Sequence, residues 1–286
     1  MAKSALLKSS LAKKYWMALT GLFLCLFLLG HLAGNLQLIF SDADHFNQYA
    51  LFMTSNPAVK ALSYLTYISI LFHAVDGIML AYQNAKARPV RYAKEKPETN
   101  TKWASRNMAV LGTLILIFIV THMVNFWARM HFDKDMPLQK LAVEREMMPG
   151  MPKITQEFYI TTGVGQDRYL PVQTVDGKNV VLEGTKFYTV TPKKILIAEG
   201  YKDLYKITID FFKDAKYGLL FTMLYVVSMI VLAFHLNHGF ASAFQSMGWN
   251  HRKYNGLIKS FGTFFSIVVP LLFAAIPLYI HFFLKA

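Results

Sequence analysis

Five long stretches of this sequence are apolar and almost free of charged side chains. A helix needs about 20 apolar residues to cross a membrane, and each stretch is long enough. The sequence therefore predicts an all-α membrane protein, a bundle of five transmembrane helices. Because only 16% of the 286 residues are charged, against about 25% in a soluble domain, an ordinary soluble enzyme is excluded. The expected spans are about 15–41, 60–85, 107–129, 217–244 and 260–284.

Basic residues are concentrated in the N-terminal segment and in the second-to-third and fourth-to-fifth connections. The positive-inside rule then places the N-terminus in the cytoplasm and the C-terminus outside. The net charge of +13 accordingly indicates a membrane surface or an acidic partner subunit rather than nucleic acid. These basic residues are Lys3, Lys8, Lys13, Lys14, Lys86, Arg88, Arg91, Lys94, Lys96, Lys102, Arg106, Arg252, Lys253 and Lys259.

One connection, residues 131–216, is much longer than the others and divides the chain into three parts. The first part, 1–130, contains the first three spans, and the last part, 217–286, contains the fourth and fifth. The middle part is an extracytoplasmic loop under this orientation. A connection of this length is expected to have structure of its own, and a solvated cap without chemistry is its simplest interpretation.

Two patterns in this loop predict local structure. Asp176-Gly177 separates Val172–Val175 from Asn179–Leu182, which is the signal of a β-hairpin. Residues 201–214 alternate apolar and charged side chains at helical spacing. They predict an amphipathic helix that could lie on the outer face of the membrane.

Five of the nine histidines lie inside predicted spans. Ionisable side chains at membrane depth are costly and mark functional sites. One such histidine can simply form an interhelical hydrogen bond, but four consecutive helices with at least one each indicate a shared function. The five are His31, His73, His122, His235 and His238, whereas His45, His131, His251 and His281 lie in loops or at span ends and are expected at the surface.

The depths of these histidines divide them into two groups. Counted from the inner flanking charge, His31 and His122 lie beyond the middle of their spans, whereas His73 and His235 lie at or short of it. We call the first two the outer pair and the last two the inner pair. Two histidines on facing helices suit a haem bound on both faces, whereas zinc or copper needs three or four ligands at one depth. The sequence thus predicts two haem b in the bundle core, serving as electron carriers.

The fourth span offers two candidate ligands, His235 and His238. Gly239 follows His235 by four residues, as Gly77 follows His73, and a glycine there lets a flat macrocycle approach the backbone. His235 is therefore the favoured ligand, and His238 is a candidate contact of haem or quinone.

Asp76 is the one acid inside a predicted span. It follows His73 by three residues and so shares a helix face with it. Two interpretations remain open: a hydrogen-bonded structural acid near the headgroups, and a proton relay or quinone contact beside the inner pair.

Three segments resemble a known family: Thr20–His31 (TGLFLCLFLLGH), Leu71–Gly77 (LFHAVDG) and Phe234–Gly239 (FHLNHG), with Gly248-Trp249 following. Together with the five spans, they are similar to the di-haem cytochrome b subunit of succinate dehydrogenases and fumarate reductases, in its single-chain, five-helix form. The resemblance does not extend to the long loop. Ala233 also stands where some fumarate reductases have a glutamate proposed to carry protons, so such a path is not expected here.

The resemblance implies axial ligands at His31, His73, His122 and His235, with the first span paired with the third and the second with the fourth. It implies a membrane anchor without catalytic residues of its own, in the cytoplasmic (inner) membrane of a bacterium. A flavoprotein subunit and an iron–sulfur subunit would bind its cytoplasmic face and contain the FAD and the iron–sulfur clusters. Electrons would pass between succinate or fumarate and a membrane quinone, with menaquinone favoured by the di-haem form.

Two alternatives share the intramembrane histidines. A di-haem anchor of another quinone-linked oxidoreductase, of the formate dehydrogenase or nitrate reductase type, differs in its partner subunits. A transporter that uses histidines for protons or metal ions differs in having no chromophore.

Overall fold

The structure, a computed structural model, describes residues 9–87, 102–146, 153–190 and 193–285. The chain forms two compact units. Unit 1 comprises Met1–Phe40, Asn56–His122 and Phe211–Ala286, and unit 2 comprises Ser41–Ser55 and Met123–Asp210. The basic residues Lys3, Lys8, Arg88, Arg91, Lys94 and Lys96 lie outside the described residues.

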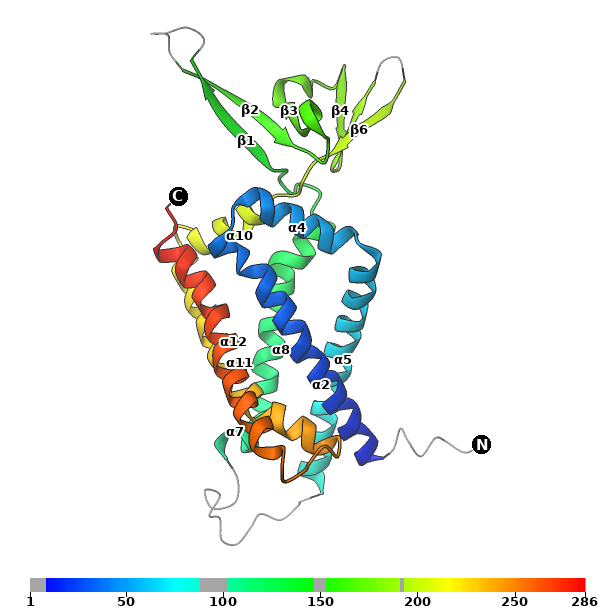
Figure 1. The fold of residues 1–286 in the computed structure, drawn as a ribbon, viewed down its shortest axis with the longest axis vertical. Coiled ribbons are helices and arrows are strands. Elements are labelled where there is room, and N and C mark those ends of the chain that lie inside the picture. Colours follow the sequence, from blue (N-terminus) through cyan, green and yellow to red (C-terminus); the bar gives the residue numbers. More distant parts are fainter. Residues whose placement is uncertain (1–8, 88–101, 147–152, 191–192, 286) are drawn as a thin grey trace, which may run out of the picture. The chain divides into compact units, whose positions relative to one another are not determined.

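Long helices packed along one another make up unit 1 (Figure 1). Among the described residues, five helical segments are long and apolar enough to cross a membrane: Leu11–Phe40, Pro57–Lys86, Met108–Phe132, Gly218–Ser246 and Asn255–Phe282. The prediction of a multi-pass membrane protein with five spanning helices is therefore confirmed. The helices of unit 1 are α2 (Ser10–Asn35), α3 (Gln37–Phe40), α5 (Pro57–Lys86), α7 (Trp103–Arg106), α8 (Met108–His122), α11 (Gly218–Ser246) and α12 (Asn255–Phe282).

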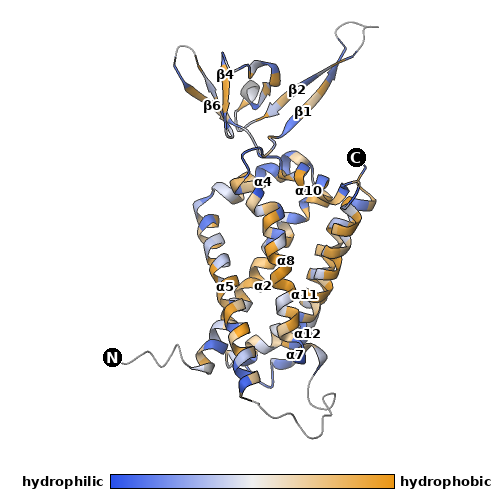
Figure 2. Cartoon of the chain, turned by 180° about the vertical axis from the view of Figure 1, so that it is seen from behind, coloured by the Kyte–Doolittle hydropathy of each residue, from blue (hydrophilic) through white to orange (hydrophobic). Residues whose placement is uncertain are grey.

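Most residues of the long helices are apolar, as Figure 2 shows along α2, α8, α11 and α12. Leu26, Leu71 and Leu271 are each more than 60% exposed, which would be costly in water but is expected of side chains that face lipid.

The start of α5 is fixed by a local N-cap. The Asn56 side chain accepts hydrogen bonds from the N–H groups of Ala58 and Val59, and this N-cap satisfies backbone donors that the helix leaves free.

Close packing joins α11 to α12. Gly262 is buried, and a Cβ added to it would lie 2.7 Å from Cδ1 of Phe240. One turn further along α12, the buried Ser266 hydroxyl accepts a 3.1 Å hydrogen bond from the side-chain amide of Asn237. The absence of a side chain at Gly262 lets the two helices approach closely, and the hydrogen bond between Asn237 and Ser266 joins them. Both features are common at helix contacts within membranes.

Gly262→Ala is expected to destabilise the bundle by about 1–3 kcal/mol, because the new methyl group must displace the packed ring of Phe240. The measurement is thermal unfolding of the purified chain in detergent. Gly256→Ala is the matched control on the same helix, since a Cβ there meets nothing within 4 Å. Equal melting temperatures for the two variants would contradict the prediction.

Unit 2 combines short helices with two small antiparallel sheets. One sheet has the strand order β1-β2-β3, and the other has the order β4-β5-β6. Loop 131–216 thus contains β structure, as predicted. The elements of unit 2 are α4 (Ala43–Ser55), a π-helix (Met123–Ala128), α9 (Arg129–Phe132), β1 (Lys140–Arg145), β2 (Ile154–Ile160), β3 (Tyr169–Pro171), β4 (Val180–Glu183), β5 (Lys186–Thr189), β6 (Ile195–Glu199) and α10 (Leu204–Lys213), whose last turn belongs to unit 1.

The hairpin lies in a different position from the predicted one. Residues Val172–Thr174 form a short 3-10 helix, and β4 pairs with β5 across Gly184, which has a φ of +63°. Asp176 instead forms a local turn, in which its carboxylate accepts hydrogen bonds from the N–H groups of Lys178 and Asn179. An Asp-Gly pair stabilises both kinds of turn, so the predicted pairing was wrong although the turn is present.

Two buried polar side chains join the helices of unit 2. The Asp203 carboxylate accepts 2.9 Å hydrogen bonds from the side-chain amide of Asn47 and from the N–H of Lys206. The amide oxygen of Asn47 in turn accepts from the N–H of Tyr205. Asn47 is 1% exposed and Asp203 is 8% exposed. Both residues therefore hold the N-terminal end of α10 against α4.

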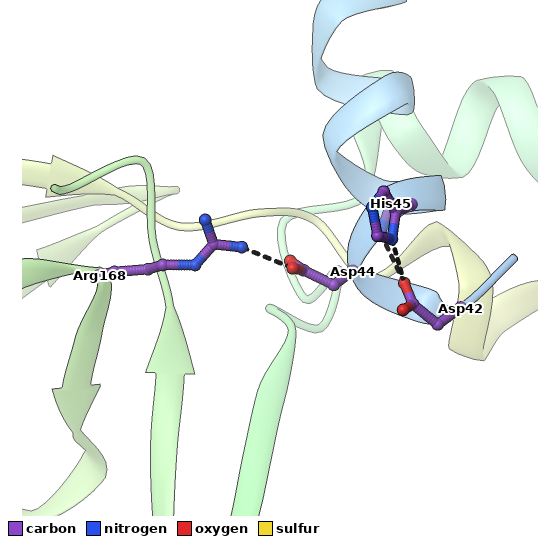
Figure 3. Close-up of polar contacts among 4 residues, drawn as sticks. All are labelled: Asp42, Asp44, His45 and Arg168. Atoms are coloured by element: carbon purple, nitrogen blue, oxygen red, sulfur yellow. Dashed lines mark hydrogen bonds and ion pairs between the residues drawn. The ribbon is translucent and has the colours of Figure 1, made fainter. Parts of the chain in front are cut away.

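Charged groups line the N-terminal end of α4 (Figure 3). Arg168 and Asp44 form an ion pair with 2.5 Å between nitrogen and oxygen. Beside it, Asp42 accepts hydrogen bonds from both the N–H and the imidazole of His45. These two bonds hold the pKa of the Asp42 carboxyl below its ordinary value, since they favour the charged form.

The C-terminal end of α12 is fixed by two reciprocal contacts. The imidazole of His281 donates a 2.7 Å hydrogen bond to the backbone carbonyl of Phe212, and the ammonium of Lys213 donates to the carbonyl of Leu284. Both acceptors are carbonyls at helix ends that lack a partner within the helix. His281 is half-buried, so the expectation that it lies at the surface was wrong.

Candidate functional site

The structure brings four of the intramembrane histidines together as two pairs. The imidazole rings of His31 on α2 and His122 on α8 have centroids 5.9 Å apart, with ring planes at 88°. Those of His73 on α5 and His235 on α11 have centroids 6.1 Å apart, with planes at 67°. These are the outer and inner pairs defined from the sequence.

The two pairs lie at different levels of the bundle. A Cβ on Gly21 of α2 would lie 3.1 Å from Cε1 of His73, and one on Gly112 of α8 would lie 3.8 Å from Cε1 of His235. Each glycine precedes the outer-pair histidine of its own helix by ten residues, which corresponds to about 15 Å of helix. The helices of the outer pair therefore also contact the inner pair, through positions that have no side chain.

Hydrogen bonding around the inner pair is uneven. Nδ1 of His73 lies 3.1 Å from the backbone carbonyl oxygen of Met17 and 3.4 Å from the hydroxyl of Thr20. The carbonyl can only accept, so the imidazole donates to it and Nε2 remains free to bind a metal. Nδ1 of His235 is buried and has no hydrogen-bond partner within the described part of the chain.

The outer pair has a different environment, dominated by aromatic rings. Phe27 stacks on His31 at 5.2 Å, and Phe118 stacks on His122 at 5.6 Å. Both phenylalanines precede their histidine by four residues, so each ring pair lies on one helix face. Nδ1 of His122 lies 3.3 Å from the hydroxyl of Tyr225. These neighbours restrict the orientation of each imidazole.

At His31 the polar neighbour is Asn35, whose side-chain nitrogen lies 3.4 Å from Nδ1 and donates a 2.8 Å hydrogen bond to the backbone carbonyl of His31. A metal on Nε2 requires a proton on Nδ1 and hence an acceptor beside it. Binding of a metal by His31 therefore calls for the amide oxygen of Asn35 to turn toward the ring.

The spacing of each pair fits a single metal held from two opposite sides. A metal–imidazole bond of about 2.0 Å, with ~1.2 Å from nitrogen to ring centre, puts opposed ring centroids about 6.4 Å apart. The observed 5.9 and 6.1 Å are close to this value. No group of three or more His, Cys, Asp or Glu within reach of one metal ion occurs among the described residues. Each pair thus offers two imidazoles as donors to one metal.

The two glycines that follow the inner-pair histidines are not closely packed against other side chains. A Cβ added to Gly239 would meet nothing within 4 Å, and one added to Gly77 would meet only the sulfur of Met17, at 4.0 Å. Both glycines lie one turn beyond an inner-pair histidine, where the sequence predicted that a macrocycle could approach the backbone.

His238 and Asp76 lie near the inner pair. His238 is half-buried and lies within electrostatic range of His235 on its own helix and of Lys102. Asp76 is also half-buried and within electrostatic range of His73. The ring of Trp103, which follows Lys102, packs edge-to-face on Phe234 of α11 at 5.5 Å.

Comparisons of this chain with protein-family models, with curated proteins and with solved structures find no match.

Proposed function

We propose that this chain is the cytochrome b subunit that anchors a succinate dehydrogenase or fumarate reductase to the membrane. The outer and inner pairs would each hold one haem b through its iron. The observation that supports this most is the meeting of four intramembrane histidines, from four helices, as two pairs at two levels. The sequence resemblance supplies the identity of the enzyme.

The haems would supply one-electron chemistry, and the chain would supply ligands, orientation and a dry environment. Two imidazoles on each iron would leave it no open position, so such a site would suit electron transfer rather than oxygen binding. The Met17 carbonyl, the Tyr225 hydroxyl and the stacked phenylalanines would hold the imidazoles in place. Apolar helices and their lipid-facing side chains keep water away from both levels.

The start of α2, helix α7 and the connection between α11 and α12 lie at one end of unit 1 (Figure 1). Exposed basic residues occur in these segments, just before α7 and in the first turns of α12. In our proposal this end faces the cytoplasm and binds the iron–sulfur subunit, which with the flavoprotein subunit contains the clusters and the FAD. The positive charge of the exposed basic residues suits an acidic partner surface. Electrons would then pass between that subunit and a membrane quinone, menaquinone being favoured. The exposed residues are Lys14, Lys102, Arg106, Arg252, Lys253 and Lys259.

A redox difference spectrum of the purified chain tests the proposal. Two b-type components and two haems per chain are the expected result. A chain without a chromophore would overturn the proposal and favour a transporter that uses its histidines for protons or metal ions. Purification of the intact complex separates the remaining alternative: a covalent-FAD subunit with succinate:quinone activity supports our proposal, whereas a formate or nitrate enzyme contradicts it.

Asp76→Asn tests whether the acid near the inner pair takes part in quinone chemistry. The substitution keeps the shape and removes a titratable proton. We expect both haems to be retained, electron transfer to quinone to slow roughly tenfold or more, and its pH dependence to change. The matched control is Asp135→Asn, an exposed acid outside the spanning helices. Unchanged quinone turnover across pH would leave Asp76 a structural role only.

A further inference from the structure

The His122 imidazole of the outer pair faces a tyrosine that the sequence did not single out. Tyr225 lies on α11, and its hydroxyl oxygen is 3.3 Å from Nδ1 of His122. The phenol ring packs edge-to-face against Phe118 and Phe212, with centroids 5.0 Å away in both cases, and against Phe211 at 5.8 Å. A ring confined on three sides in this way presents its oxygen in a fixed position.

The chemistry of the imidazole sets the direction of this contact. For Nε2 of His122 to bind a metal, its lone pair must be free and Nδ1 must carry the proton. Nδ1 then donates and the Tyr225 oxygen accepts. An acceptor on Nδ1 makes the coordinating nitrogen more basic, and a more basic ligand stabilises ferric over ferrous iron.

The other histidines have different neighbours at Nδ1. Nδ1 of His73 donates to the backbone carbonyl of Met17 and has the Thr20 hydroxyl at a longer 3.4 Å, the side-chain nitrogen of Asn35 lies 3.4 Å from Nδ1 of His31, and Nδ1 of His235 has no partner among the described residues. Tyr225 is therefore a side chain through which the sequence can adjust one pair without changing the other. It precedes His235 by ten residues on the same helix. Helix α11 therefore provides His235 to the inner pair and the hydrogen-bond partner of His122 to the outer pair.

We propose that Tyr225 is the positioning residue of the outer haem. Its oxygen accepts the Nδ1 proton of His122, fixes the plane of that imidazole nearly perpendicular to the ring of His31, and lowers the midpoint potential of the outer haem. This inference rests on the proposed function, because it requires a haem between His31 and His122.

Tyr225→Phe in the full chain removes the oxygen and keeps the packed ring. At a fixed potential we expect the ratio of oxidised to reduced outer haem to fall about three- to tenfold, the effect of one hydrogen bond. This is a rise of about 30–60 mV for a one-electron couple. The ferric low-spin EPR signal of the same haem should also shift, since it depends on the angle between the two imidazole planes. The component lost in His31→Ala identifies the outer haem, and the inner one should be unchanged.

Tyr217→Phe is the matched control, a phenol at the start of the same helix whose ring lies beside Phe221 and Lys216. It should leave both potentials and both EPR signals unchanged. Loss of the outer haem alone in Tyr225→Phe would also support the assignment, whereas loss of both haems would show a purely structural role and overturn it. Two bound haems with unchanged potential and EPR signal would overturn it too, while leaving the proposed function intact. Absence of haem from the parent chain would instead contradict the proposed function.

Discussion

His31→Ala and His122→Ala should each abolish binding of the outer haem, and His73→Ala and His235→Ala should each abolish binding of the inner haem. The expected result is a fall from two haems per chain to one, because an iron that loses one of its two protein ligands in an apolar site loses most of its affinity. Pyridine haemochrome quantification and redox titration measure the number of haems and identify the missing component.

His131→Ala is the matched control, since this exposed imidazole stacks on Trp127 outside both pairs. It should retain two haems. The choice within α11 is tested by the same measurement. A variant His235→Ala that keeps both haems, together with His238→Ala that loses one, would show that the ligand of α11 has been assigned to the wrong histidine.

Asp203→Ala is expected to destabilise unit 2 by about 2–4 kcal/mol. The substitution leaves the buried amide of Asn47 without its acceptor and removes the N-cap of α10. Limited proteolysis of the full chain in detergent, followed over a temperature series, measures the effect as faster cleavage within residues 153–190.

Asp210→Ala provides the comparison on the same helix. Asp210 is exposed and forms an ion pair with Lys206 at 2.8 Å, and such pairs contribute roughly 0.5 kcal/mol or less. Its cleavage rate should match that of the parent chain. Equal rates for the two variants would show that the hydrogen bonds accepted by Asp203 contribute no more than a surface ion pair.

The spanning helices could be predicted because the membrane imposes a length and a composition on each helix separately. Pro57–Lys86, for example, agrees within three residues with the span of 60–85 expected from its flanking charges. Loop 131–216 obeys no such constraint. The Asp176-Gly177 turn was visible in the sequence, but which strands pair depends on partners such as β5 and β6, whose register no short motif encodes.

The two histidine pairs could also be anticipated, since depth along a helix follows from counting residues. The structure brings together the same residues, while their binding of haem stays a prediction. Gly21, Gly112 and Tyr225 were not anticipated, because a contact between helices depends on how each helix is rotated about its axis. Each of these three residues precedes a paired histidine (His31, His122 or His235) by ten positions, and this spacing is visible in the sequence. It could not be interpreted without knowing how each helix is rotated about its axis.

The pairing of alternate helices has a consequence for the order in which the protein can assemble. A chain made from its N-terminus inserts α2 and α5 first, and these two contain one member of each pair and no complete pair. The third span, with His122, completes the outer pair. His73 has to wait for His235, which follows His122 by some hundred residues that include the longer segment of unit 2, Met123–Asp210. We therefore expect the two pairs to form in sequence, and a ribosome stalled within Met123–Asp210 would present a nascent chain with one complete pair and one histidine still lacking its partner.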